Sequence, residues 1–155
     1  MPIQIGQAAP NFTLFNTEKK EISLSDFKDK NVVILFFPLA FTGVCTAELC
    51  NIRDNYNVYT SLNTEVLGIS VDSLFTLEQF KIQQNYNFDL LSDFNKTASK
   101  DYNSLYESFA FGMQGVSKRS AFVIDKNGIL QYAEVLEDAG KQPNFEAIKS
   151  CLEKI

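Results

Sequence analysis

Histidine and tryptophan are absent from this 155-residue chain, and cysteine, proline and glycine are scarce, with three, four and seven residues. Without histidine, neither a Ser-His-Asp triad nor a Cys-His pair can form, and most zinc and non-haem iron sites lose their usual ligand. The cysteines form no Cys-x-x-Cys pair, which argues against a zinc ribbon and a redox dithiol motif. Glycine-rich phosphate loops are also missing, so no nucleotide-binding loop is predicted.

Basic charge and long apolar runs are lacking as well. With 14 basic and 19 acidic side chains the net charge is −5, so no basic stripe is available to bind nucleic acid or an anionic membrane surface. No apolar run approaches the roughly 20 residues that span a bilayer, and residues 1–6 lack the basic and apolar regions of a signal peptide. We therefore expect a cytoplasmic protein without nucleic-acid or membrane partners.

The chain does contain enough apolar material for one core. Hydrophobic residues make up 45% of it and include 14 phenylalanines and 6 tyrosines. No repeat, low-complexity tract or linker interrupts the sequence, so a single domain over residues 1–155 is expected.

The apolar pattern predicts alternating strands and helices. We expect strands over 32–37, 65–71, 120–125 and 129–135, helices over 44–60, 74–86 and from 144 onward, a helical turn over 25–27 and a hairpin within 11–23. The first strand–helix–strand unit implies a right-handed crossover with parallel strands, and the last two strands form an antiparallel hairpin. This order predicts an α/β domain of the thioredoxin-like fold, with a central mixed β-sheet flanked by helices and an N-terminal hairpin extension.

The strongest functional signal is the segment Phe37-Pro38-Leu39-Ala40-Phe41-Thr42-Gly43-Val44-Cys45. It places Cys45 after a buried strand and at the start of a helix, where backbone N–H groups and the helix dipole favour a nucleophilic thiolate. On residue type alone, Cys45 could equally be a small buried hydrophobe. Pro38, Thr42 and Cys45 fill every fixed position of a Pro-x-x-x-Thr-x-x-Cys motif, and through it the chain resembles the peroxiredoxins.

The resemblance extends over nearly the whole chain. Residues 91–93 and 119–125 match segments of the family, and the sequence of residues 37–45 is most similar to that of its AhpE-like members. It implies an antioxidant peroxidase in which the Cys45 thiolate reduces hydrogen peroxide or an organic hydroperoxide and becomes a sulfenic acid. The reaction that the resemblance implies requires neither a metal nor an organic cofactor.

The resemblance also assigns roles to two residues before the cysteine. Thr42 would orient the peroxide and the thiolate through its hydroxyl, although a threonine here could simply cap the following helix. Pro38 would shield the sulfur from solvent, although a proline that ends a strand is common.

Arg119, 74 residues after Cys45, matches the motif arginine of the family. The resemblance makes it the cation that stabilises the thiolate and the developing oxyanion, whereas an arginine at a strand start is usually a solvated charge. Lys118 lacks the planar fork of donors and is expected to be a surface residue. Glu48 is expected to be a first-turn carboxylate, favoured by the helix dipole, with a supporting role.

Cys50 follows Cys45 by five residues, a spacing that resembles the Q-type, or bacterioferritin-comigratory, peroxiredoxins. The resemblance implies an intramolecular Cys45–Cys50 disulfide that thioredoxin or a similar dithiol reduces. Five residues of α-helix give about 7.5 Å of rise and roughly 140° of rotation, which does not fit a disulfide. We therefore expect residues 44–52 to unwind on oxidation. The alternative is a one-cysteine peroxidase whose sulfenic acid an external thiol attacks.

Cys151 has the spacing of a core residue beside Phe145, Ile148, Leu152 and Ile155, so a structural role is expected, although a resolving role through a second subunit stays open. The resemblance implies a homodimer, and Phe41 and the aromatic-rich residues 105–113 are candidates for its surface. A competing interpretation is a non-catalytic redox sensor or binding module, in which Cys45 is oxidised once and passes the disulfide to a target. A disulfide oxidoreductase is disfavoured by the missing Cys-x-x-Cys.

Overall fold

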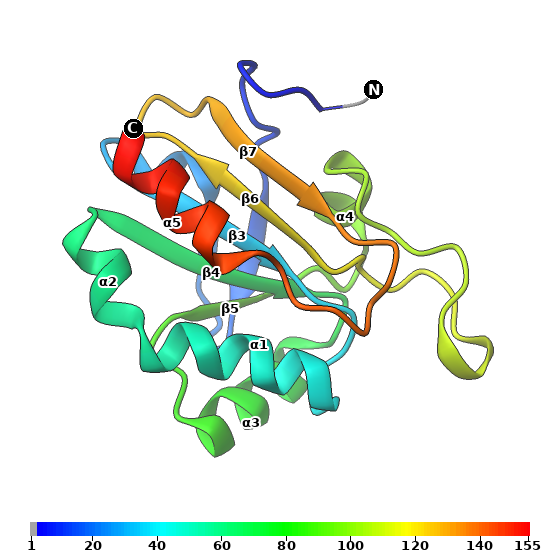
Figure 1. The fold of residues 1–155 in the computed structure, drawn as a ribbon. Helices are drawn as coiled ribbons and strands as arrows, with labels where there is room; N and C mark the ends of the chain where they lie inside the picture. The colour runs from blue at the N-terminus through cyan, green and yellow to red at the C-terminus, as the bar shows by residue number, and fades with distance from the viewer. Residues whose placement is uncertain (1–2) are drawn as a thin grey trace.

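A seven-stranded mixed sheet organises the computed structural model, which describes residues 3–155 (Figure 1). The strand order is β2-β1-β5-β4-β3-β6-β7; β3, β4 and β5 run parallel, and the other pairs are antiparallel. In chain order the elements are β1 Thr13–Asn16, β2 Glu21–Ser23, the 3-10 helix η1 Leu24–Phe27, β3 Asn31–Phe36, α1 Gly43–Asp54, α2 Tyr56–Ser61, β4 Thr64–Ser70, α3 Leu74–Gln84, β5 Asp89–Ser92, α4 Thr97–Asp101, the 3-10 helix η2 Ala110–Gly112, β6 Ser120–Ile124, β7 Leu130–Val135 and α5 Phe145–Lys154.

The central strand β3 is buried on both faces, as its unbroken apolar run predicts. Successive side chains of a strand point to opposite faces. Val33 and Leu35 accordingly join one core cluster, while Val32, Ile34 and Phe36 join the other. The sheet therefore separates two apolar layers.

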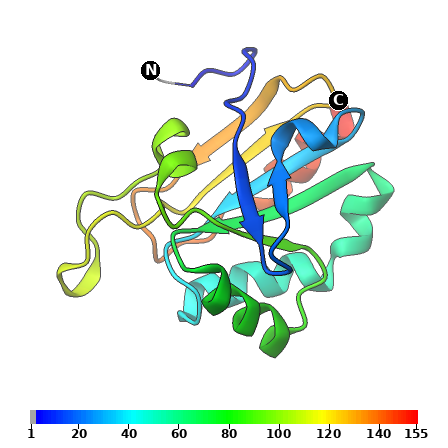
Figure 2. The ribbon, with the colours of Figure 1, turned by 180° about the vertical axis from the view of Figure 1, so that it is seen from behind.

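The two layers have different covers. Helices α1, α2, α3 and α5 lie on one face (Figure 1), whereas α4, η1 and the N-terminal segment lie on the other (Figure 2). The parallel β3–α1–β4 crossover places the start of α1 at the carboxyl end of β3. With the β1–β2 hairpin at one edge, this is the predicted thioredoxin-like α/β fold with an N-terminal extension. Over residues 3–155, none of the helices combines the length and hydropathy needed to cross a membrane.

Some local predictions are wrong. The single helix expected over 44–60 is broken at Asn55, which has non-helical φ and ψ of −117° and 19° and whose side-chain amide donates to the Asn51 carbonyl at 2.8 Å. Strand β5 and helix α4 were not predicted; both are short, and β5 is held between β4 and β1. Ile155, expected in the core, is 43% exposed at the chain end.

Candidate active site

Cys45 is the third residue of α1, and its side chain is fully buried. Residues 37–42, here called the cysteine loop, connect the end of β3 to this helix. Phe37 and Pro38 are buried, and Phe41 adopts a left-handed φ of 67° that reverses the chain just before α1 begins. The loop thus aims the thiol at the carboxyl edge of the sheet, beside the start of β6.

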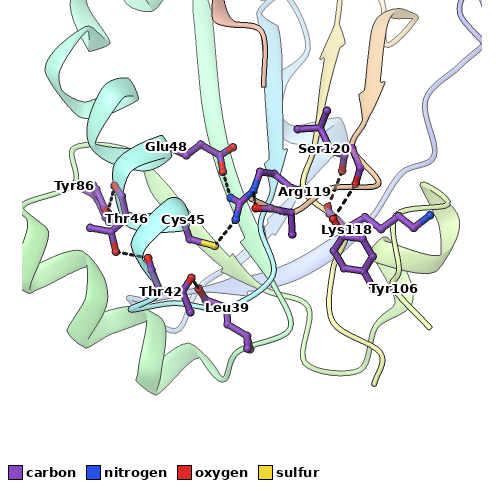
Figure 3. Close-up of polar contacts among 12 residues, drawn as sticks. Leu39, Thr42, Cys45, Thr46, Glu48, Tyr86, Tyr106, Lys118, Arg119 and Ser120 are labelled. Atoms are coloured by element: carbon purple, nitrogen blue, oxygen red, sulfur yellow. Dashed lines mark hydrogen bonds and ion pairs between the residues drawn. The ribbon is translucent and has the colours of Figure 1, made fainter. Parts of the chain in front are cut away.

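Arg119 reaches the sulfur from that neighbouring strand. Because β6 pairs with β3, with Ser120 opposite Phe36, Arg119 lies next to the cysteine loop. Its Nη2 donates to Cys45 Sγ at 3.1 Å and its Nη1 to Glu48 Oε1 at 2.6 Å (Figure 3). Its Nε donates to the Ala139 carbonyl at 2.8 Å.

The Arg119 side chain is only 2% exposed, so all these contacts are made away from water. Burial by itself lowers the pKa of the guanidinium, but the Glu48 carboxylate and the Cys45 sulfur outweigh burial and raise it. The alternative of a solvated surface charge is therefore wrong for Arg119. The group is a fixed cation, held on three sides, with one N–H directed at the sulfur.

Glu48 differs from its prediction. It is the sixth residue of α1, in the second turn instead of the first, and it is completely buried and paired with Arg119. Its Oε1 accepts from the guanidinium, while its Oε2 has no hydrogen-bond partner among the described residues. Burial raises the pKa of Glu48 to about 7, against the attraction of Arg119. Helix-dipole stabilisation, the reason given for this residue, is thus not what holds it.

Thr42 occupies the N-cap position of α1, but its side chain makes no cap hydrogen bond. The hydroxyl donates instead to the Leu39 carbonyl at 2.8 Å within the cysteine loop. The Thr42 carbonyl accepts from the Thr46 hydroxyl at 2.8 Å and from the Thr46 N–H at 2.9 Å. The predicted capping alternative is therefore wrong, and Thr42 fixes the loop beside the thiol.

Asp72 is a residue of the site that the sequence did not reveal. Its Oδ2 accepts from the Ala40 N–H at 2.8 Å and from the Ser70 hydroxyl at 2.7 Å, which ties the end of β4 to the cysteine loop. The contact exists only because β3 and β4 pair, so no local sequence pattern could have shown it.

Cys50 lies apart from this cluster, although it is on the same helix. Its half-buried Sγ is 3.7 Å from Gln84 Oε1 and 3.8 Å from the Tyr86 hydroxyl, and α1 is continuous between the two cysteines. All three cysteines are free thiols. Cys151 packs partly buried on α5, with its Sγ 3.9 Å from the Gln131 carbonyl, and burial raises its pKa.

Lys118 is more constrained than expected. Its Nζ pairs with Glu137 Oε1 at 2.8 Å and lies 5.8 Å from the centre of the Tyr106 ring, and its side chain is only 21% exposed. It makes no contact with the sulfur. No group of three or more His, Cys, Asp or Glu side chains that could hold a metal ion occurs between residues 3 and 155.

The site combines a buried thiol at a helix start with a buried arginine that donates a hydrogen bond to it. In a thioredoxin-like fold, this combination defines a class of thiol-based redox enzymes. Residues 5–133 match the AhpC/TSA family, and the chain belongs to that family as a peroxiredoxin, a thiol-dependent peroxidase.

Individual relatives support the same assignment. A chloroplastic 2-cysteine peroxiredoxin of Chattonella marina is 42% identical over 146 residues, covering 87% of this chain and 72% of that protein. A Coxiella burnetii protein named as a peroxiredoxin of the bcp type is 38% identical, covering 84% of this chain and 87% of its own length. The reduced crystal structure of Plasmodium vivax 2-Cys peroxiredoxin superposes with a TM-score of 0.85 at 32% identity, covering 98% of this chain and 81% of that chain.

Proposed function

We propose that the protein reduces hydrogen peroxide and organic hydroperoxides at Cys45, with Arg119 as the group that stabilises charge. The observation that carries this proposal is the 3.1 Å contact from Arg119 Nη2 to Cys45 Sγ, which joins two buried side chains. A guanidinium at this distance stabilises the thiolate before the reaction and the departing oxygen during it.

In the proposed first step the Cys45 thiolate attacks one peroxide oxygen. The S–O bond forms as the O–O bond breaks, and the leaving oxygen takes a proton and departs as water or an alcohol. Arg119, the N–H groups at the start of α1 and the Thr42 hydroxyl are the available donors for the peroxide oxygens. For Thr42 this requires exchanging the Leu39 carbonyl for the peroxide.

Glu48 and Pro38 have supporting roles in this proposal. The Glu48 carboxylate holds Nη1 of Arg119 at 2.6 Å, which leaves Nη2 directed at the sulfur. Pro38 is buried where the cysteine loop leaves β3, and it keeps water from that side of the thiol.

The proposed second step forms a disulfide between Cys45 and Cys50. The Cys50 thiolate attacks Cys45 Sγ, the S–O bond of the sulfenic acid breaks, and the hydroxyl leaves as water after taking a proton. Because the two residues lie on one continuous helix, residues 44–52 must unwind first. A dithiol reductant such as thioredoxin then returns both cysteines to thiols by disulfide exchange. Such a cycle suits the cytoplasm, where dithiol reductants keep thiols reduced.

A homodimer is part of the proposal, and its support is two exposed phenylalanine side chains. Phe41, in the cysteine loop, is 47% exposed, and Phe111 in the 105–113 segment is 99% exposed with a left-handed φ of 60°. Sedimentation of the reduced protein tests this point: a 35 kDa species is expected, and a 17.5 kDa species at micromolar concentration contradicts it.

Steady-state peroxide consumption tests the proposed function. With thioredoxin, thioredoxin reductase and NADPH, we expect continuous turnover. A single stoichiometric oxidation of Cys45, with no turnover under several dithiol reductants, would contradict the peroxidase and favour a redox sensor. Turnover with a monothiol only would favour the one-cysteine cycle.

A further inference from the structure

The last residue of α3 and the connection that follows it, residues 84–87, fasten α1 on the side that carries Cys50. The Tyr86 hydroxyl donates to the Thr46 carbonyl at 3.3 Å (Figure 3). The same hydroxyl lies 3.8 Å from Cys50 Sγ. Further along the helix, Arg53 Nη1 donates to the Gln84 carbonyl at 2.6 Å, and the Asn87 amide donates to the Arg53 carbonyl at 3.2 Å. The connection thus touches α1 in the turn after Cys45, at Cys50 and near the helix end.

The Tyr86 ring is a rigid support for its hydroxyl. The side chain is 5% exposed and packs between Phe80, at a ring distance of 5.2 Å, and Phe88, at 5.5 Å. Phe80 also contacts Phe41 of the cysteine loop at 5.0 Å. No step of the peroxide reaction uses the Tyr86 hydroxyl, yet it is placed between the Thr46 carbonyl and the Cys50 thiol.

We infer that the Tyr86 hydroxyl is a latch on α1, which must be released before Cys50 can reach Cys45. This inference rests on the proposed function, because it concerns the same oxidation cycle. Unwinding of residues 44–52 moves the Thr46 carbonyl and the Cys50 thiol away from residues 84–87. Both contacts of the hydroxyl are therefore lost in the opened state, and they stabilise the closed state alone.

The latch decides between two fates of the Cys45 sulfenic acid. In the closed helix the sulfenic acid stays beside Arg119, where a second peroxide can transfer an oxygen to the sulfur, giving a sulfinic acid and releasing water or an alcohol. In the opened helix the Cys50 thiolate attacks the sulfur, the disulfide forms and water leaves. A stronger latch favours the sulfinic acid, and a weaker latch favours the disulfide.

Tyr86→Phe removes only the hydroxyl and keeps the ring in its aromatic contacts. Tyr59→Phe is the matched control, because the Tyr59 hydroxyl is also buried but has no hydrogen-bond partner in the described part of the chain. The loss of one hydrogen bond predicts about two- to tenfold faster hydrogen exchange of the amides of residues 46–52 in reduced Tyr86→Phe protein. Equal exchange in the wild type and both variants would overturn the latch.

Peptide mass spectrometry after excess peroxide tests the consequence. In Tyr86→Phe we expect the ratio of Cys45–Cys50 disulfide to Cys45 sulfinic acid to rise by about the same two- to tenfold, with Tyr59→Phe at the wild-type ratio. An unchanged ratio despite faster amide exchange would overturn the control of fate by the latch. Absence of the 45–50 disulfide in all three proteins would instead refute the resolving role of Cys50, and the exchange rates would still report on the latch.

Discussion

Cys45 and Cys50 lie on one helix but in two different environments. Cys45 is fully buried and faces the Arg119 guanidinium at 3.1 Å, whereas Cys50 is half-buried and faces the neutral side chains of Gln84 and Tyr86 at 3.7 and 3.8 Å. A buried guanidinium donates a hydrogen bond to the first sulfur, whereas the second sulfur makes two long contacts with neutral groups. In the proposed cycle, the reacting sulfur and the resolving sulfur therefore start five residues apart on one continuous helix.

The comparison implies that only the sulfur beside the cation is essential for the first oxidation. Cys45→Ser is expected to abolish peroxide consumption completely, because among the described residues Cys45 is the cysteine whose sulfur accepts a hydrogen bond from a guanidinium. The measurement is peroxide loss under single-turnover conditions. Cys151→Ser is the control and is expected to keep wild-type rates, since Cys151 packs against β7 on α5. Peroxide consumption by Cys45→Ser at the wild-type rate would remove the distinction between the cysteines.

Arg119→Lys tests whether a charge alone activates Cys45. A lysine keeps the charge but cannot donate to Cys45, Glu48 and the Ala139 carbonyl together, as the planar fork does. We expect the second-order rate of Cys45 oxidation, measured by stopped flow, to fall on the order of 10²- to 10³-fold. Lys118→Met changes the charge one position away and is expected to alter the rate less than about twofold. Comparable rates in Arg119→Lys and wild type would show that the fork is dispensable.

Cys50→Ser tests the second cysteine while leaving the surroundings of Cys45 unchanged. The first oxidation of Cys45 is expected to keep its rate within about twofold, because the Arg119 contact is untouched, while turnover with thioredoxin falls at least about tenfold. Comparing single-turnover oxidation with steady-state consumption provides the test. Equal steady-state turnover in the variant and wild type would establish the one-cysteine cycle instead.

The smallest expected effect comes from Glu48, and it is an effect on the free energy of unfolding. Its pKa of about 7 in the folded protein lies above its ordinary 4.5 because burial favours the neutral form. The folded protein therefore binds a proton that the unfolded chain releases between about pH 4.5 and 7. Raising the pH through this window lowers the free energy of unfolding.

In Glu48→Gln this part of the pH dependence is expected to vanish, a difference on the order of 1–3 kcal/mol between pH 5 and pH 8 in urea denaturation. Glu137→Gln, which removes an exposed partner of Lys118, is expected to keep the wild-type dependence. The prediction fails if wild type and Glu48→Gln lose stability equally over this range.

The fold was largely readable from the sequence because its signals are local. The apolar run of β3, the β6–β7 hairpin around Asn127 and the N-terminal hairpin each depend on neighbouring residues. Strand β5 forms instead by pairing with β1 and β4, which are distant in the chain. The apolar pattern of its four residues was too short to predict a strand. The break at Asn55 was missed because apolar spacing continues through it.

In the candidate site, too, features encoded by local sequence could be predicted, whereas contacts between distant segments could not. Cys45 and Thr42 could be placed from one short motif, and Arg119 from the resemblance that this motif carries. The Arg119–Glu48 pair, separated by 71 residues, and the Asp72–Ala40 bond, separated by 32, exist only after the strands have paired. Tyr86 was missed for the same reason, since its partner Thr46 is 40 residues away.

Peptide mapping after one equivalent of hydrogen peroxide is the decisive test of the proposed cycle. We expect Cys45 and Cys50 to be recovered joined in one disulfide, with Cys151 still a free thiol. A stable sulfenic acid at Cys45 beside a free Cys50, or a disulfide that includes Cys151, would contradict it.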